Sequence, residues 1–261
     1  MNRIIAYVAA LFPLLAIHLA WGQSSTSAPT AGAGVQAASR PAAAAAAGAG
    51  APIEVEKYAR TIRVACVGDS VTARTGLQDG TPYPQQLGKM LGAKWQVGNF
   101  GVSGATLLNH GDFPYQKQPA FKSVLAWGPD VVIVMLGTND TQGQNWKFKG
   151  EFADDYKDLI KKFAALPGKP RIYICTPPPT RKGGNYGIRE EGVVELIPVI
   201  ARVAAEMNVG LIDMYGALKS HRSLIPDKVH PNTAGSTFMA KAACQALTGK
   251  DFDQASASRP K

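Results

Sequence analysis

The stretch IRVACVGDSV at residues 62–71 decides the fold class. Its first six residues are mostly apolar and β-branched and are followed by a glycine, which predicts a short strand buried on both faces of a sheet. Similar runs lie at residues 95–100, 131–136, 171–176 and 210–213. Apolar residues at helical spacing lie at residues 84–91, 152–165, 193–207 and 233–247. This alternation predicts an α/β domain with an open, five-stranded parallel sheet and right-handed crossovers.

The first 22 residues are typical of a secretory signal peptide. They combine Arg3 with a seventeen-residue apolar run, and Ala20 and Gly22 are the small residues expected before a cleavage site, here at Gln23. A retained membrane anchor is the alternative, but a run of this length, interrupted by Pro13, is short for a bilayer span. We therefore expect a secreted or periplasmic protein that is not inserted in a membrane once the signal is cleaved.

The segment that follows, residues 23–52, is composed mainly of Ala, Gly, Ser, Thr and Pro. It has few large apolar side chains to bury, so it cannot offset the conformational entropy that folding costs. We expect a flexible tether here, a single folded domain over residues 53–250 and a flexible tail over residues 251–261.

The composition is that of an ordinary globular domain. Of the 261 residues, 46% are hydrophobic and 18% are charged, and the formal net charge is +9. This charge is modest and comes without a Lys/Arg block, so nucleic acid is not an expected partner. Four scattered histidines without an HExxH or paired CxxC pattern predict no metal site, and we expect no cofactor. The oligomeric state is not apparent from the sequence.

The three cysteines are too few for a disulfide-stapled scaffold in a chain of this length. Cys66 and Cys175 fall on predicted strands that flank the third, so two interstrand spacings, about 9–10 Å, separate them. This distance exceeds the reach of a disulfide. Pairing of Cys66 with Cys244 is an alternative, but buried free thiols are the expected state.

Four polar loops are the candidates for a functional site, because loops at the carboxyl ends of parallel strands meet at one edge of the sheet. They are GDSV at residues 68–71, NFGVSG at 99–104, GTND at 137–140 and DKVHP at 227–231. Glycines in the second loop allow backbone N–H groups to approach a ligand closely. Each loop alone also fits an ordinary turn with a polar cap, so only their combination is informative.

The combination supplies the parts of a serine nucleophile and its base. The Ser70 hydroxyl attacks a carbonyl only when a base takes its proton, and His230 is the side chain suited to this near neutral pH. Asp227 lies three residues before His230, close enough on a turn to orient the ring and to stabilise its charged form. The backbone N–H groups of Ser70 and Gly101 and the Asn139 amide are the predicted donors to the oxyanion.

The four loops, in this order, resemble the four sequence blocks of the SGNH (GDSL-type) hydrolases, and the resemblance extends over residues 63–247. It implies a flavodoxin-like three-layer α/β/α fold with strand order 2-1-3-4-5. It also implies a Ser-His-Asp triad of Ser70 as nucleophile, His230 as base and Asp227 as its partner. The oxyanion hole that the resemblance implies consists of Ser70, Gly101 and Asn139.

Departures from the family and competing residues do not change this reading. Val71 stands where the GDSL motif has Leu, which is common in the family, and the GxSxG elbow of α/β-hydrolases is absent. Ser103 is an alternative nucleophile, but it lies in the loop expected to cradle the oxyanion. His110, close to Asp112, is an alternative residue at the rim of the site, although an exposed loop histidine is the commoner case. His221 has no carboxylate at a helpful spacing.

Two loops at the predicted site edge indicate a sugar substrate. Residues 141–149 contain Asn145 and Trp146, and residues 177–187 contain Tyr186. Amide and aromatic side chains together suit a sugar, because they combine hydrogen bonding with stacking. Alternatively, Trp146 only pins the following helix to the domain.

The stretch at residues 137–156, with NYGIRE at residues 185–190, is similar, more loosely, to secreted bacterial proteins described as sialate O-acetylesterase-like. We therefore expect a serine esterase that hydrolyses short-chain esters, acetyl esters first, of a small molecule or glycan through an acyl-enzyme. A lipid esterase, lysophospholipase or thioesterase is the alternative among enzymes, although polar loops do not suit a long acyl chain. A non-catalytic carbohydrate-binding protein is the other alternative, but binding alone would not need all of these residues.

Overall fold

The computed structural model describes residues 50–73 and 81–250, and the predicted signal peptide, most of the predicted tether and the predicted tail lie outside these residues. Ile53 is the first buried residue of the described chain, and its N–H donates to Leu247 O over 2.8 Å. Tyr173 also donates its hydroxyl to Ala51 O at 3.4 Å, so the last residues of the predicted tether already contact the domain. The helices of the two described ranges lack the combination of length and apolarity that a bilayer span requires.

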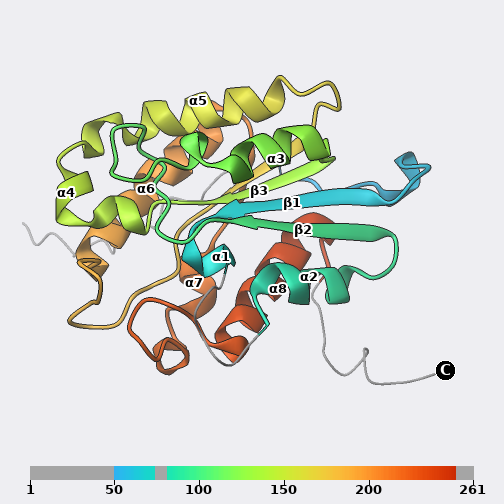
Figure 1. Ribbon diagram of the computed structural model, residues 1–261. Helices are drawn as coiled ribbons and strands as arrows, with labels where there is room; N and C mark the ends of the chain where they lie inside the picture. The colour runs from blue at the N-terminus through green and yellow to red at the C-terminus, as the bar shows by residue number, and fades with distance from the viewer. Residues whose placement is uncertain (1–49, 74–80, 251–261) are drawn as a thin grey trace, which may run out of the picture. The chain divides into compact units, whose positions relative to one another are not determined.

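Five parallel strands form one sheet in the order β2-β1-β3-β4-β5, which confirms the predicted topology (Figure 1). They are β1 (Ile62–Gly68), β2 (Trp95–Gly101), β3 (Val131–Met135), β4 (Arg171–Cys175) and β5 (Gly210–Ile212). Every residue of β3, the central strand, is buried. Because neither face of this strand contacts water, all of its residues are apolar and do not alternate with polar ones.

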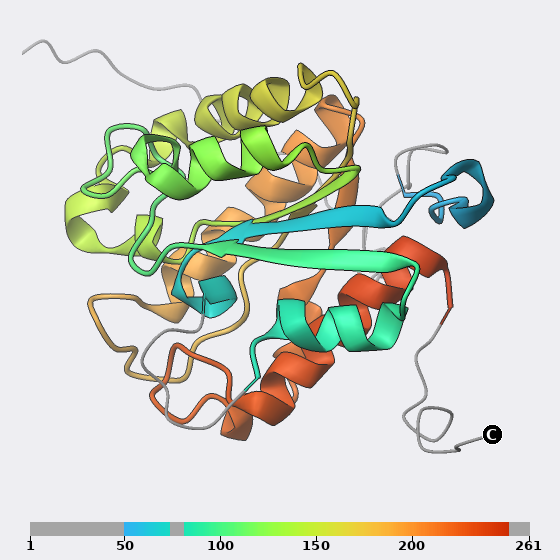
Figure 2. The ribbon, with the colours of Figure 1, turned by 45° about the vertical axis from the view of Figure 1, so that its right-hand side comes forward.

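Helices cover both faces of the sheet, so the domain has three layers (Figures 1 and 2). One face packs against α3 (Pro119–Trp127), α5 (Phe152–Ala164) and α6 (Glu190–Glu206). The other face packs against α2 (Tyr83–Leu91) and α8 (Thr233–Thr248), with the short α1 (Ser70–Ala73) and α7 (Met214–Leu218). Short segments in the loops are α4 (Gly143–Trp146) and the 3₁₀ helices Val55–Lys57, Tyr115–Lys117, Asn139–Thr141, Lys149–Glu151 and Arg222–Leu224. Successive residues of β1 alternate between the two cores, as the pleat of a strand requires.

The four helical patterns found in the sequence do not include one between the second and third strands, but α3 forms there. Only Phe121 and Val124 of its nine residues are buried. Two side chains are too few to show the helical spacing of apolar residues in the sequence. Pro119 begins the helix, where a missing N–H removes no intrahelical bond. Gly128, with φ +61°, ends it.

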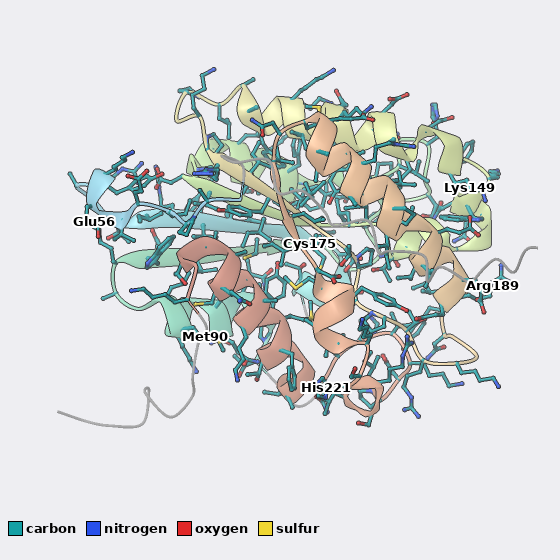
Figure 3. All side chains as sticks on the ribbon, turned by 180° about the vertical axis from the view of Figure 1, so that it is seen from behind. Glu56, Met90, Lys149, Cys175, Arg189 and His221 are labelled. Carbon is teal, nitrogen blue, oxygen red and sulfur yellow. The ribbon has the colours of Figure 1, made fainter. Side chains whose placement is uncertain are left out.

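Cys66, Cys175 and Cys244 are buried free thiols, which confirms the expectation from the sequence. Burial raises the pKa of Cys66 to about 12, so its thiolate is not available near neutral pH. Cys175, the last residue of β4, is buried in the core on the face of the sheet that α2 and α8 cover (Figure 3).

The carboxyl ends of the strands lie at one edge of the sheet, and the polar loops leave from there (Figure 1). Gly68 at the end of β1 pairs in register with Gly101 of β2 and with Met135 of β3. Three of the loops therefore leave adjacent strands at the same level. Seen from behind, Lys149 and Arg189 lie at this end of the sheet and Glu56 lies at the opposite end (Figure 3).

Candidate active site

Ser70 begins α1 directly after β1 and is half-buried. The turn from strand to helix is too tight for a side chain at Gly68, because a Cβ there would lie 2.1 Å from Thr72 Oγ1. Asp69 closes the turn by accepting the N–H of Val71 at 2.9 Å. Since the first N–H groups of a helix have no intrahelical partner, the turn offers both the hydroxyl and the N–H of Ser70 at the end of the strand.

Ser70, His230 and Asp227 form one line of hydrogen bonds. His230 Nε2 lies 2.8 Å from Ser70 Oγ, and His230 Nδ1 lies 2.6 Å from Asp227 Oδ2. The other carboxylate oxygen of Asp227 accepts the backbone N–H groups of Val229 at 3.0 Å and of His230 at 2.7 Å. The structure therefore brings together the three residues that the sequence predicts for catalysis.

The charge of Asp227 determines which nitrogen of His230 carries the proton. Burial opposes ionisation, but hydrogen bonds from the backbone and ring of His230 and from Val229 N–H outweigh it and hold the pKa of Asp227 below its usual value. An ionised carboxylate only accepts hydrogen bonds, so Nδ1 of His230 donates to it. Nε2 is then free to accept from the Ser70 hydroxyl, which is the arrangement that a general base requires.

Asn139 is held beside the loop that follows β2. Its side-chain Nδ2 donates to Ala105 O at 3.1 Å, and its backbone carbonyl accepts from Asn145 Nδ2 at 3.0 Å. The neighbouring Asp140 accepts the N–H groups of Leu107 at 3.0 Å and of Leu108 at 2.8 Å. These bonds join the loops after β2 and β3 and fix the Asn139 amide at the site edge.

The structure does not place Gly101 as an oxyanion donor, which corrects the prediction. Its N–H donates to Asn99 Oδ1 at 3.0 Å and is therefore already engaged. A glycine is required there for another reason, because a Cβ would lie 2.2 Å from Ala73 N in α1. Gly104, further along the same loop, is exposed, has φ +82° and directly precedes the residue whose carbonyl Asn139 contacts. Gly104 rather than Gly101 therefore adjoins the Asn139 amide.

Two buried carboxyl groups lie under the site. Burial raises the pKa of Asp69 to about 6, although the Val71 N–H and the nearby His230 oppose the shift. Burial likewise raises the pKa of Asp140 to about 7; two backbone N–H groups oppose this shift and the nearby Asp69 adds to it. Both pKa values start from 3.8, so folding takes up protons between about pH 4 and about pH 7.

We expect the stability of the protein to fall as the pH rises from about 5.5 to about 8. In this window the folded chain binds more protons than the unfolded chain, so the free energy of unfolding decreases with rising pH. Asp69→Asn removes one of the two groups but keeps an oxygen for the Val71 N–H. Its fall over this window should be smaller by about 1 kcal/mol, because only the part of the Asp69 titration above pH 5.5 contributes. Calorimetric unfolding at the two pH values measures the difference, and an equal fall in both proteins would contradict this assignment.

Tyr186 lies against the catalytic histidine. The ring centroids of Tyr186 and His230 are 5.7 Å apart in an edge-on arrangement. Gln142 Nε2 donates to the Tyr186 carbonyl at 2.8 Å, and Asn185 Nδ2 donates to Asp227 O at 3.0 Å. The loop after β4 is thus bonded both to the loop after β3 and to the catalytic loop. The sequence places Gln142 and Asn185 in loops near the predicted site, but their bonds between the loops could not be predicted, because polar residues are common in loops.

Asn145 and Trp146 lie near the site but contact the protein. The buried Asn145 amide donates to Asp112 Oδ1 at 2.9 Å as well as to Asn139, and its oxygen accepts the Asp112 N–H at 2.9 Å. Asn145 therefore holds the Asn139 loop, whereas the sequence predicts a substrate contact. Trp146 is half-buried against the core, and Lys149 Nζ lies 4.9 Å from its ring centroid. These contacts favour the packing alternative for Trp146.

The other histidines of the described chain have partners away from the triad. His110 Nδ1 lies 2.7 Å from Glu151 Oε2 at the surface. His221 stacks on Phe238, with ring centroids 4.1 Å apart. Across residues 50–73 and 81–250, no three His, Cys, Asp or Glu side chains gather in a group that could hold a metal ion.

Comparison with known proteins gives one family and several related proteins. Residues 66–238 match the GDSL-like lipase/acylhydrolase family. An acetylxylan esterase of Xylanibacter ruminicola is 37% identical over an alignment of 207 residues, which covers 71% of this chain and 43% of the relative. The chain therefore spans less than half the length of that relative.

Solved structures share the fold. A carbohydrate acetylesterase family member of Sinorhizobium meliloti matches with a TM-score of 0.60 and 22% identity, over 73% of this chain and 100% of that one. An aryl esterase of M. smegmatis matches with a TM-score of 0.56 and 24% identity, over 71% of this chain and 97% of that one. At these identities the likeness concerns the fold alone.

Proposed function

Because the chain belongs to the GDSL-like lipase/acylhydrolase family, we propose that it is a serine esterase that removes acetyl groups from a carbohydrate. The observation that carries the proposal is the line of hydrogen bonds from Asp227 through His230 to Ser70. A protein that only bound carbohydrate would have no use for a serine hydroxyl bonded to an oriented base. The triad instead fits ester hydrolysis in two steps through an acyl-enzyme.

In the first step, the Ser70 oxygen attacks the ester carbonyl while His230 Nε2 takes the hydroxyl proton. Asp227 stabilises the imidazolium that results, and the proton then passes to the leaving oxygen of the alcohol. The acetyl group stays on Ser70. In the second step, a water molecule gives a proton to His230 and attacks the acetyl carbonyl. Acetate leaves, and Ser70 regains its proton.

The tetrahedral intermediates carry a negative charge on the former carbonyl oxygen. Three donors are positioned to stabilise it: the Ser70 N–H at the start of α1, the Asn139 amide, and the Gly104 N–H in place of the predicted Gly101. Asn139 is held by its bond to Ala105 O, so little reorganisation is needed during the reaction. Each such donor typically contributes about a hundredfold or more to kcat.

The surroundings of the triad support a polar alcohol and a short acyl group. The relative described as an acetylxylan esterase supports a carbohydrate. Gln144 and Asp112 are exposed beside the site, and amide and carboxylate groups match sugar hydroxyls. Three large apolar side chains are exposed among the described residues, so this part of the chain offers little surface to a long acyl chain. On a suitable apolar surface, each CH₂ group of a longer acyl chain would add about 0.8 kcal/mol to binding.

We also propose that the protein acts outside the cytoplasm. Residues 1–22 have the charge and apolar pattern of a secretory signal peptide. Such a location fits a polymeric carbohydrate substrate, because an enzyme on the outer side of the membrane can reach a polymer that lies there.

Hydrolysis of p-nitrophenyl acetate, butyrate and octanoate by the purified protein tests the acyl part of the proposal. We expect kcat/KM to be at least about tenfold lower for octanoate than for acetate, because the longer chain finds little apolar surface to bury. Release of acetate from acetylated xylan tests the alcohol part. Preference for octanoate would instead support a lipid esterase. Glycan binding without turnover of any ester would support the non-catalytic alternative.

A further inference from the structure

Among the described residues, few large apolar side chains are exposed, and two of them border the active site. Within the described residues, Phe113 is 42% exposed, Tyr186 is 58% exposed and Val194 is 44% exposed. Phe113 lies in the loop after β2 and Tyr186 lies in the loop after β4. Both loops leave the edge of the sheet where the strands end (Figures 1 and 2). Val194 lies on α6, in the helical layer.

Phe113 stands on the oxyanion side of the site. Its carbonyl accepts the N–H of Thr106 at 2.9 Å, which ties it to the loop that contains Gly104. A Cβ built on Gly104 would lie 3.8 Å from Phe113 Cδ1, so the ring is in contact distance of this glycine. Phe113 is therefore a neighbour of the Gly104 N–H that the reaction uses.

Tyr186 stands on the base side of the site, beside His230. Its backbone has φ +53°, a conformation that residues with side chains adopt rarely, and Gly184 and Gly187 near it also have positive φ. Asn185 Oδ1 accepts the Tyr186 N–H at 2.9 Å, and Gln142 donates to its carbonyl. These bonds keep in place a large ring that the core does not need.

A chain of polar side chains joins the two aromatic positions. Gln142 binds the Tyr186 carbonyl, and its own Oε1 accepts from Gln144 Nε2 at 3.0 Å. Gln144 Nε2 also donates to Asp112 Oδ2 at 2.9 Å, and Asp112 directly precedes Phe113. The wall between the two rings is thus made of amide and carboxylate groups, which suit hydroxyl groups, whereas an acyl chain would require an apolar wall.

We propose that Phe113 and Tyr186 stack against sugar units on either side of the acetylated unit, so that the substrate is an oligosaccharide or polysaccharide chain and not a free acetylated monosaccharide. This inference rests on the proposed function. An ester placed at Ser70 lies between the Gly104 wall and the His230 wall, so a sugar chain that carries it extends toward both rings. Aromatic faces pack against the C–H faces of sugar rings, and the polar wall binds their edges.

The test measures kcat/KM on acetylated xylose, acetylated xylotetraose and p-nitrophenyl acetate. For the wild-type protein we expect at least about tenfold higher kcat/KM on the tetrasaccharide than on the monosaccharide, which corresponds to about 1.4 kcal/mol of added binding in the transition state. Phe113→Ala and Tyr186→Ala should each lower kcat/KM on the tetrasaccharide at least about fivefold more than on p-nitrophenyl acetate. Val194→Ala is the matched control, and its kcat/KM should equal the wild-type value on both the tetrasaccharide and p-nitrophenyl acetate.

A conservative variant separates stacking from loop structure. Tyr186→Phe keeps the ring, so it should retain most of the preference for the tetrasaccharide, which Tyr186→Ala loses. Equal losses on the tetrasaccharide and on p-nitrophenyl acetate would overturn the inference, as would a wild-type protein that deacetylates xylose and xylotetraose equally well. Hydrolysis of p-nitrophenyl acetate without acetate release from either sugar would overturn the proposed function as well. A larger loss on p-nitrophenyl octanoate would assign the two rings to a lipid acyl chain.

Discussion

Ser70→Ala lowers kcat for p-nitrophenyl acetate by at least about ten-thousandfold, because removal of the nucleophile from a serine triad leaves only binding and oxyanion stabilisation. KM should change far less, since the hydroxyl bonds to His230 and not to the bound ester before the attack. Initial-rate kinetics with enzyme purified from a host that lacks background esterase measure both constants.

Ser103→Ala is the matched control for this result. Ser103 is an exposed serine in the neighbouring loop and is the alternative nucleophile that the sequence allows. His230 Nε2 lies 2.8 Å from Ser70 Oγ, so this histidine is placed to activate Ser70. We expect Ser103→Ala to keep kcat within about threefold of the wild-type value, as substitutions outside the catalytic groups commonly do. A large loss in Ser103→Ala together with survival of activity in Ser70→Ala would reverse the assignment.

Asp227→Asn is expected to lower kcat by about a thousandfold or more. The carboxylate accepts the ring Nδ1–H through one oxygen and two backbone N–H groups through the other. An Asn side chain has one acceptor oxygen in place of two, so its NH₂ group faces either the ring or the backbone. When it faces the ring, it donates to Nδ1 and places the proton on Nε2, where the ring no longer accepts from Ser70.

Asp213→Asn provides the control for a loss of charge without a loss of the triad. Asp213 also accepts a backbone N–H three residues later, from Gly216 at 2.8 Å, but its role is to begin α7. Asn serves equally well at such a position, so kcat and the melting temperature should stay close to the wild-type values. Equal kcat losses in the two variants would mean that Asp227 acts through folding and not through the histidine.

The sheet and the triad could be predicted because local patterns determine them. A continuously apolar strand such as β3 needs cover on both faces, and the order of the strands then follows from right-handed crossovers and from the family resemblance. Ser70 and His230 are 160 residues apart, yet both lie at strand or helix ends that the sheet brings to one edge. A serine nucleophile needs a histidine base and an acidic partner, and few residues of the sequence fit these two roles.

The details that were missed depend on side-chain contacts that spacing does not encode. Which backbone N–H is free in the loop after β2 depends on Asn99, whose oxygen occupies the N–H of Gly101. Asn145 and Asn139 look alike as polar loop residues, but only the fold shows that one supports the other. In the sequence, Phe113 is a single aromatic residue in a loop. Its position beside Gly104 depends on the backbone hydrogen bond from Thr106 N–H to Phe113 O, which the spacing does not reveal.

Covalent labelling by a fluorophosphonate, followed by peptide mass spectrometry, tests the central claim most directly. Such a reagent reacts with a serine that a base activates and leaves a stable phosphonyl ester in place of the acyl group. We predict one adduct, on Ser70, formed in step with the loss of esterase activity and absent from Ser70→Ala. An adduct on Ser103 or elsewhere that accompanies inactivation, or full esterase activity with Ser70 completely labelled, would contradict the account.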